Sequence, residues 1–184
     1  MTILKRKYFF GFIFCNLFRL LRVFPNNDPL MGFLLPFSHK GKWWHMLLFP
    51  VVAMVSFDLI TMKAGIWTVG TALVYGLIGL AFYSYFKGKE KAGLKSYAKA
   101  SILGVLFFDF VTGPIMSSFI FEIPFQTALI GQIPFTVLHI TSALIYTLIL
   151  APVLNPHIAN SVTANLDKQI SRVKMLIKIP ERVF

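Results

Sequence analysis

Two aspartates lie inside the most apolar stretches of this chain, in nearly the same five-residue context. The segments are FDLIT at 57–61 and FDFVT at 108–112, and they hold Asp58 and Asp109, two of only seven acidic residues. In each segment a threonine follows the aspartate by three residues, so Asp58 and Thr61, like Asp109 and Thr112, share one face of a helix. A carboxylate beside a hydroxyl can bind a polar ligand, hold a proton or pair with a cation.

A carboxylate in such a setting needs a partner. A charged side chain at the centre of a bilayer costs roughly 2.5–3.5 kcal/mol on insertion scales. Two explanations follow for Asp58 and Asp109, and both can hold together. The aspartates line a wet binding pocket, or they pair with Arg19 and Arg22 near the end of the first apolar segment and hold the helices together. A proton relay is a third alternative.

Other polar side chains are expected at the same depth, in the outer half of the molecule. His139 is interpreted as a packed hydrogen-bonding group rather than a metal ligand, because the chain has no Cys/His cluster. No Gly-rich phosphate loop and no GxSxG motif is present, so we expect no cofactor, no metal and no enzymatic activity. The candidate substrate-binding residues are Asn26, Asn27, Asp28, Asp58, Thr61, Asp109, Thr112, Gln132 and His139.

Composition places the chain in a membrane. Of its 184 residues 57% are hydrophobic and 20 are Phe, and the mean hydropathy is +0.72, whereas soluble domains are about 45–50% apolar. The net charge of +11 comes from short basic clusters between apolar segments, which is typical of membrane loops and not of a nucleic-acid surface. The single Cys15 excludes a disulfide within the chain. We expect an all-α integral membrane protein.

The basic residues predict how the chain crosses the membrane. Six apolar segments occur, at about 8–24, 27–38, 43–61, 66–86, 100–119 and 125–154. If all six cross, fifteen of the 18 basic residues lie on one side, which the positive-inside rule makes the cytoplasm. The sequence therefore predicts a six-helix bundle in the plasma membrane with both termini cytoplasmic. The first segment lacks a signal-peptide cleavage site and is expected to remain as a helix.

Two of these segments are irregular. The segment at 27–38 covers only about 20 Å as a helix, so we expect it to pack among other helices or border a cavity, unless the bilayer thins there. Such short segments often mark a transporter's binding site. The segment at 125–154 contains Pro134, which predicts a short surface helix at about 125–133 followed by a spanning helix that the proline breaks or kinks.

Three further patterns concern packing. The two pentapeptides, each followed by TAL, suggest a duplication with a 51-residue offset. Ala72, Gly76 and Gly79 form a stripe of small residues that lets another helix approach, either within the chain or from a partner subunit. Residues 156–184 have apolar positions at helical spacing among basic residues, which predicts a cytoplasmic amphipathic tail after a transmembrane domain at 1–155.

The chain resembles the substrate-binding S components of energy-coupling-factor vitamin transporters. The resemblance covers about 24–154 and rests on PNNDPLMGFLLPF, VAMVSFDLI, LFFDFVTG and LIGQIPFTVLHITSALIYTLILAPVL. It implies a membrane protein that captures a vitamin or similar nutrient from outside, working with a transmembrane coupling subunit and two ATPase subunits. Many members of that family dock their partner through an alanine-xxx-alanine patch on the first helix, where this chain has the bulky FFGFIFCNLFRLLR.

Two other functions stay open on the sequence. A stand-alone carrier would use Asp58 or Asp109 as its proton site and would need no ATPase. A membrane scaffold or assembly protein would use the polar pairs only to hold the bundle, and its basic tail would matter most.

Overall fold

The computed structural model describes residues 3–21, 26–39, 41–89 and 91–178, so Arg22 lies outside the described residues. Within these ranges the chain forms helices and connecting loops, with no β-strand. The long helices are α1 (Ile3–Leu21), α3 (Trp43–Ile60), α4 (Ile66–Phe86), α5 (Leu94–Phe110), α7 (Phe125–Leu154) and α8 (Pro156–Lys178). The short ones are α2 (Leu30–Leu34), the 3₁₀ turn η1 (Leu35–Phe37), the π turn η2 (Val111–Ile115) and α6 (Met116–Phe121).

Among the described residues, four helical segments are long and apolar enough to cross a membrane. They are α3, α4, the continuous rod Leu94–Phe121 made of α5, η2 and α6, and α7. This confirms the expectation of an all-helical protein with membrane-spanning segments. The rod contains Pro114, and the π turn around it keeps the helix continuous.

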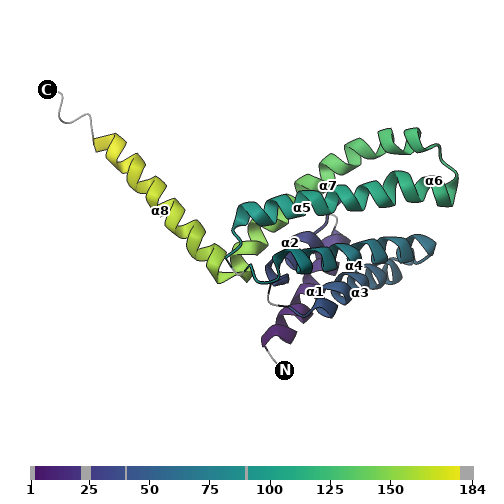
Figure 1. The fold of residues 1–184 in the computed structure, drawn as a ribbon, viewed down its shortest axis with the longest axis horizontal. Coiled ribbons are helices and arrows are strands. Elements are labelled where there is room, and N and C mark those ends of the chain that lie inside the picture. The colour runs from purple at the N-terminus through teal and green to yellow at the C-terminus, as the bar shows by residue number, and fades with distance from the viewer. Residues whose placement is uncertain (1–2, 22–25, 40, 90, 179–184) are drawn as a thin grey trace.

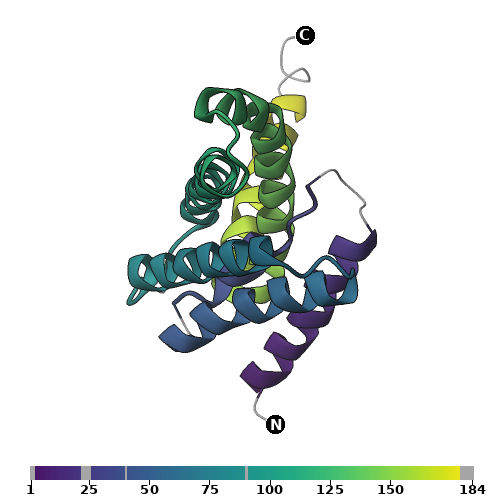
Figure 2. The same cartoon turned by 90° about the vertical axis from the view of Figure 1, so that its right-hand side faces the viewer.

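The four segments form two antiparallel pairs, α3 with α4 and the α5–α6 rod with α7, which lie one below the other in Figure 1 and at an angle in Figure 2. In the first pair, Gly79 and Gly76 of α4 approach the Met46 carbonyl and the Leu47 side chain of α3. In the second, Ser101 of α5 accepts a hydrogen bond from Thr147 of α7 at 3.2 Å.

The short helix α2 is buried at the centre of the molecule. The large apolar side chains of α2 and η1 are each at most 3% exposed: Leu30, Met31, Phe33, Leu34, Leu35 and Phe37. A Cβ on Gly32 would lie 2.6 Å from the Tyr146 carbonyl carbon of α7, so only glycine allows this approach. The predicted packing of the short segment is confirmed, but α2 and η1 together give only about 12 Å of helix, less than the predicted 20 Å.

The helices α1 and α3 run parallel to each other. Tyr8 stacks on His45 near the two starts, with ring centroids 5.1 Å apart, and Arg19 lies 4.2 Å above the Phe57 ring near the two ends. The chain between α1 and α3, which includes α2, therefore returns to the end of the molecule where α1 begins.

The expected break at Pro134 is absent. Instead of a surface helix at 125–133 and a second helix, α7 is continuous over Phe125–Leu154 with Pro134 inside it. The reason is packing: the first turns of α7 lie along η2 and α5, where Gln132 contacts Gly113 and Phe125 meets Phe110 at 6.3 Å between centroids. These contacts hold the turns of α7 that precede the proline.

The last helix, α8, extends away from the bundle (Figure 1). It begins after Asn155, whose Oδ1 accepts the His157 backbone N–H at 3.1 Å and whose amide donates to the Tyr97 hydroxyl at 3.3 Å. Leu166, Ile170 and Val173 are exposed along it. The division into a transmembrane domain at 1–155 and a cytoplasmic tail stays a prediction.

Candidate functional site

A buried row of three ionisable side chains joins the loop before α2 to α7 and α5. His139 contacts both carboxylates, with Nε2 3.0 Å from Asp28 Oδ2 and Nδ1 2.8 Å from Asp109 Oδ1. Asp28 is 5%, His139 4% and Asp109 1% exposed. Because both ring nitrogens are engaged by carboxylates, the imidazole has no nitrogen left for a metal ion. We call these three residues the Asp–His–Asp row.

Backbone and hydroxyl groups hold the Asp28 end of the row in place. Asp28 Oδ1 accepts the Leu30 backbone N–H at 2.9 Å, which caps the first turn of α2. The Asp28 backbone N–H donates to Ser142 Oγ of α7 at 3.0 Å, and the Tyr75 hydroxyl of α4 donates to Asp28 Oδ2. Through Leu30, Tyr75 and His139, this one carboxylate thus joins three helices.

Beside this row lies a cavity of about 680 Å³. Its polar lining includes Arg19 and Lys63, two cations that make no ion pair within the part of the chain that the structure describes. The rest of the lining is polar at Asn26, Asn27, Asp28 and His139. It is aromatic at Phe57, Trp67, Tyr75, Phe108 and Phe135, and Met54 adds a thioether. A concave site with apolar walls and a few placed polar groups is typical of small-molecule binding.

A second cavity of about 320 Å³ adjoins the first and shares five lining residues with it. Its own polar lining comes from Asp58, Thr71, Thr112, Ser117 and Gln132. The π turn η2 brings Thr112 and Gly113 to this cavity, and the Gln132 side chain packs where a Cβ of Gly113 would stand. The two hollows together form what we call the polar cavity.

Asp58 and Asp109, the aspartates of the two similar pentapeptides, have different partners. Asp58 is half-buried and its Oδ2 accepts a hydrogen bond from Thr68 Oγ1 at 2.6 Å, whereas Asp109 is buried and bound to His139. Thr61 and Thr112 behave alike, since each donates to the carbonyl four residues earlier, at 2.9 and 2.8 Å. The two threonines therefore make the same backbone hydrogen bond, although α3 ends at Ile60 while Thr112 lies in the π turn η2. The neighbouring helices decide the partner of each aspartate: α4 for Asp58 and α7 for Asp109.

The expected ion pair between Arg19 and an aspartate is not present. The Arg19 guanidinium lies over the Phe57 ring and donates to Met54 Sδ at 2.7 Å. The reason is geometric: Arg19 faces α3 at Phe57, while Asp58 turns toward the start of α4. Among the described residues the only ion pairs are those of His139.

The sequence-predicted residues are placed as follows. Asn26, Asn27, Asp28 and His139 line the larger hollow, and Asp58, Thr112 and Gln132 line the smaller one. Asn26 donates to the Phe135 carbonyl at 3.0 Å, and Asn27 donates to the Phe18 carbonyl. Asp109 and Thr61 line neither hollow: Asp109 lies behind His139, and Thr61 bonds to its own helix.

Sequence reasoning missed several cavity residues on α4. Trp67, Thr71 and Tyr75 line the hollows, and Thr68 bonds Asp58. A signal was present, because Thr68, Thr71 and Tyr75 recur at positions i, i+3 and i+7, which puts them on one helix face. Lys63 gave no such signal, since a lone lysine in a loop is ordinary.

The small-residue stripe on α4 is filled within the chain. A Cβ on Gly79 would collide with the Met46 carbonyl, and one on Gly76 would lie 3.0 Å from Leu47 and Val51, all on α3. Ala72 is 3% exposed. Because α3 already covers this face, Ala72, Gly76 and Gly79 leave no surface for docking a partner subunit.

Comparison with known proteins gives no matching family model, no matching curated protein and no matching solved structure. The site itself must therefore carry any functional argument. It offers two cations that form no ion pair with any described residue, aromatic walls and a buried row of ionisable groups, which suits binding of a small molecule with an anionic group.

Proposed function

We propose that this chain is a membrane-embedded substrate-capture subunit of the energy-coupling-factor type, and that it binds a vitamin or similar nutrient in the polar cavity. The observation that carries the proposal is the 680 Å³ hollow whose lining combines cations and aromatic rings. Its volume falls within the roughly 300–1,000 Å³ of small-molecule sites. The sequence resemblance supports the same function.

The lining favours a particular class of substrate. Phe57, Trp67, Phe108 and Phe135 supply flat apolar faces, which pack best against a ring. Arg19 supplies a guanidinium that makes no direct ion pair with a carboxylate among the described residues. We therefore propose a substrate with a planar ring and an anionic group, oriented by that charge.

Six crossings with both termini in the cytoplasm complete the proposal. The parallel course of α1 and α3 supports it, because the chain between them has to return across the bundle. The polar cavity then opens on the outer half of the molecule. A transmembrane coupling subunit and two ATPase subunits would drive transport, and this chain would hydrolyse nothing itself.

The test is native mass spectrometry of the chain purified in mild detergent, with Arg19→Gln and Arg172→Gln compared. Arg172 is exposed on α8, far from the polar cavity, so Arg172→Gln is the matched control. A charge-assisted hydrogen bond contributes about 1.5–3 kcal/mol, so we expect Arg19→Gln to lose bound small molecule by at least about tenfold. The control should retain it. No small molecule on the wild-type chain, with every variant folded, would favour the scaffold function instead.

A second candidate function is favoured by the Asp–His–Asp row. Three ionisable groups in contact inside a membrane protein are typical of proton relays, so a stand-alone proton-coupled carrier is the alternative. Proteoliposomes holding this chain alone distinguish the two. Uptake driven by a pH gradient would support the carrier, whereas binding without uptake would support the capture subunit.

A further inference from the structure

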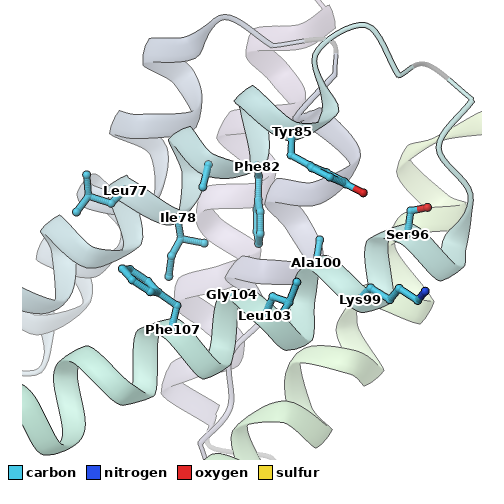
Figure 3. A pocket seen from close by; sticks show the side chains of 11 residues that line it. Leu77, Ile78, Phe82, Tyr85, Ser96, Lys99, Ala100, Leu103, Gly104 and Phe107 are labelled. Carbon is cyan, nitrogen blue, oxygen red and sulfur yellow. The ribbon is translucent and has the colours of Figure 1, made fainter.

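An apolar groove runs between α4 and α5 on the surface of the bundle (Figure 3). It has a volume of about 680 Å³ and is lined along most of its length by hydrocarbon and aromatic side chains. Leu77 of α4 and Leu103 and Phe107 of α5 are about half exposed or more on its rims. Ala100 and Gly104 are buried and form the floor of the groove, where their small side chains leave room above them.

One end of the groove is polar and basic. There the lining changes to Tyr85, Ser96 and Lys99. A hollow of about 550 Å³ adjoins this end, shares Tyr85 and Ser96, and adds Lys89 and Lys91. Lys89 Nζ lies 3.6 Å from the Tyr85 ring centroid, so a cation–π contact holds one ammonium at the mouth.

The groove is thus an apolar channel along two membrane-length helices that ends in three lysines. The start of α5 adds to the positive potential there, because a helix N-terminus carries partial positive charge. The end in question is the side that the charge distribution predicts to be cytoplasmic, where anionic lipids gather. A ligand that fits must have a hydrocarbon chain and an anionic head a short distance from it.

We propose that this groove binds one anionic phospholipid, with an acyl chain between Leu77, Phe82 and Leu103 and the phosphate held by Lys99, Lys89 and Lys91. A partner's apolar helix would fill the channel but bring no anionic group to these three lysines, so the charge favours the lipid. The inference does not depend on substrate capture, and it shares with the proposed function only the six crossings that put the basic end of the groove on the cytoplasmic side.

The test is competition binding to the delipidated full-length chain, measured by native mass spectrometry. Phosphatidylglycerol and phosphatidylcholine with identical acyl chains are added at equal concentration. A basic residue near a membrane surface contributes about 1 kcal/mol toward an anionic lipid, which is about fivefold in affinity. We expect the wild type to prefer phosphatidylglycerol, and Lys99→Ser to reduce its retention about fivefold.

The control is Lys95→Ser, which removes the same charge from the same helix one turn earlier and lines neither hollow. It should change retention less than twofold. Leu103→Trp, at a site that is 67% exposed and so tolerant of size, should fill the groove and lower binding of both lipids. Equal effects of Lys99→Ser and Lys95→Ser, equal retention of the two lipids, or no effect of Leu103→Trp would each overturn the proposal.

Discussion

His139 is the residue on which the site depends. It separates two carboxylates that would otherwise face each other without a counter-charge in a buried region, and it contacts both at hydrogen-bond distance. Protonated, it leaves the row with one net negative charge close to the Arg19 guanidinium. A row of this kind is costly when incomplete, because each buried carboxylate loses its hydration.

We predict that His139→Ala destabilises the protein by about 3–5 kcal/mol, the range for removing one member of a buried ion pair. Thermal unfolding in detergent, followed by circular dichroism, measures the change. His157→Ala is the matched control, because His157 is exposed at the start of α8, and it should unfold within about 0.5 kcal/mol of wild type. Equal stability of the two variants would show that the row contributes nothing to the fold.

A smaller loss of folding stability is expected when the Tyr75 hydroxyl, which donates to Asp28, is removed. Tyr75→Phe keeps the ring but removes a donor to a buried carboxylate, which costs about 1–3 kcal/mol. Tyr85→Phe, at a tyrosine that is 56% exposed, is the control and should leave the melting temperature unchanged. A melting temperature for Tyr75→Phe equal to that of the control would mean that water replaces the hydroxyl.

At the scale of elements, α2 decides the arrangement. It is too short to cross a bilayer alone, yet it occupies the centre between the two antiparallel pairs. Its close contact with α7 needs a glycine, and its first turn is capped by the same carboxylate that binds His139. The contacts that fix α2 in the bundle therefore also place Asp28 in the site.

Gly32→Ala tests this contact. The added Cβ would meet the backbone of Tyr146 and Thr147 at 2.6–2.8 Å, and because backbone cannot rotate away, we predict a loss of about 1–3 kcal/mol. Gly131→Ala, on α7 with nothing within 4 Å of its Cβ, is the control and should stabilise its helix by up to about 1 kcal/mol. If both alanines raise stability, α2 and α7 do not approach as described. Unfolding midpoints in detergent give both values.

At the scale of the whole molecule, the number of crossings decides which surfaces face the cytoplasm. The residues before α1 and the loop after α4 share a side if α2 returns the chain across the membrane, and lie on opposite sides if it does not. If α2 does cross, the polar cavity lies on the outer side of the bilayer and the basic end of the α4–α5 groove lies on the cytoplasmic side.

Cysteine labelling of intact cells tests that topology. Because Cys15 is buried, single cysteines can be read in its presence: Lys7→Cys, Lys91→Cys and, as the outer control, Ala64→Cys. Six crossings predict that an impermeant thiol reagent labels Ala64→Cys and spares the other two until the cells are opened. Labelling of Lys7→Cys or Lys91→Cys, but not both, in intact cells would mean that α2 does not cross.

The sequence alone determined the helical membrane class, the bounds of α3 and α4 to within a residue or two, and the burial of the short second segment. These follow from local quantities: the length of an apolar run, the position of charges and the reach of a few helical turns. The same reasoning found Asp28, Asp58, Gln132 and His139 as polar residues of one depth. It failed at Pro134, because contacts with η2 and α5 outweigh the local effect of the proline.

Only the tertiary structure decided which partner each polar residue takes. Asp28 and His139 are 111 positions apart, and their contact depends on how α2 and α7 rotate about their axes. The sequence offered arginine as the partner of Asp58 and Asp109, whereas the fold gives them threonine and histidine. Depth in a membrane is set by distance along a helix, but pairing is set by which faces meet, and the packing of all the helices together fixes those faces.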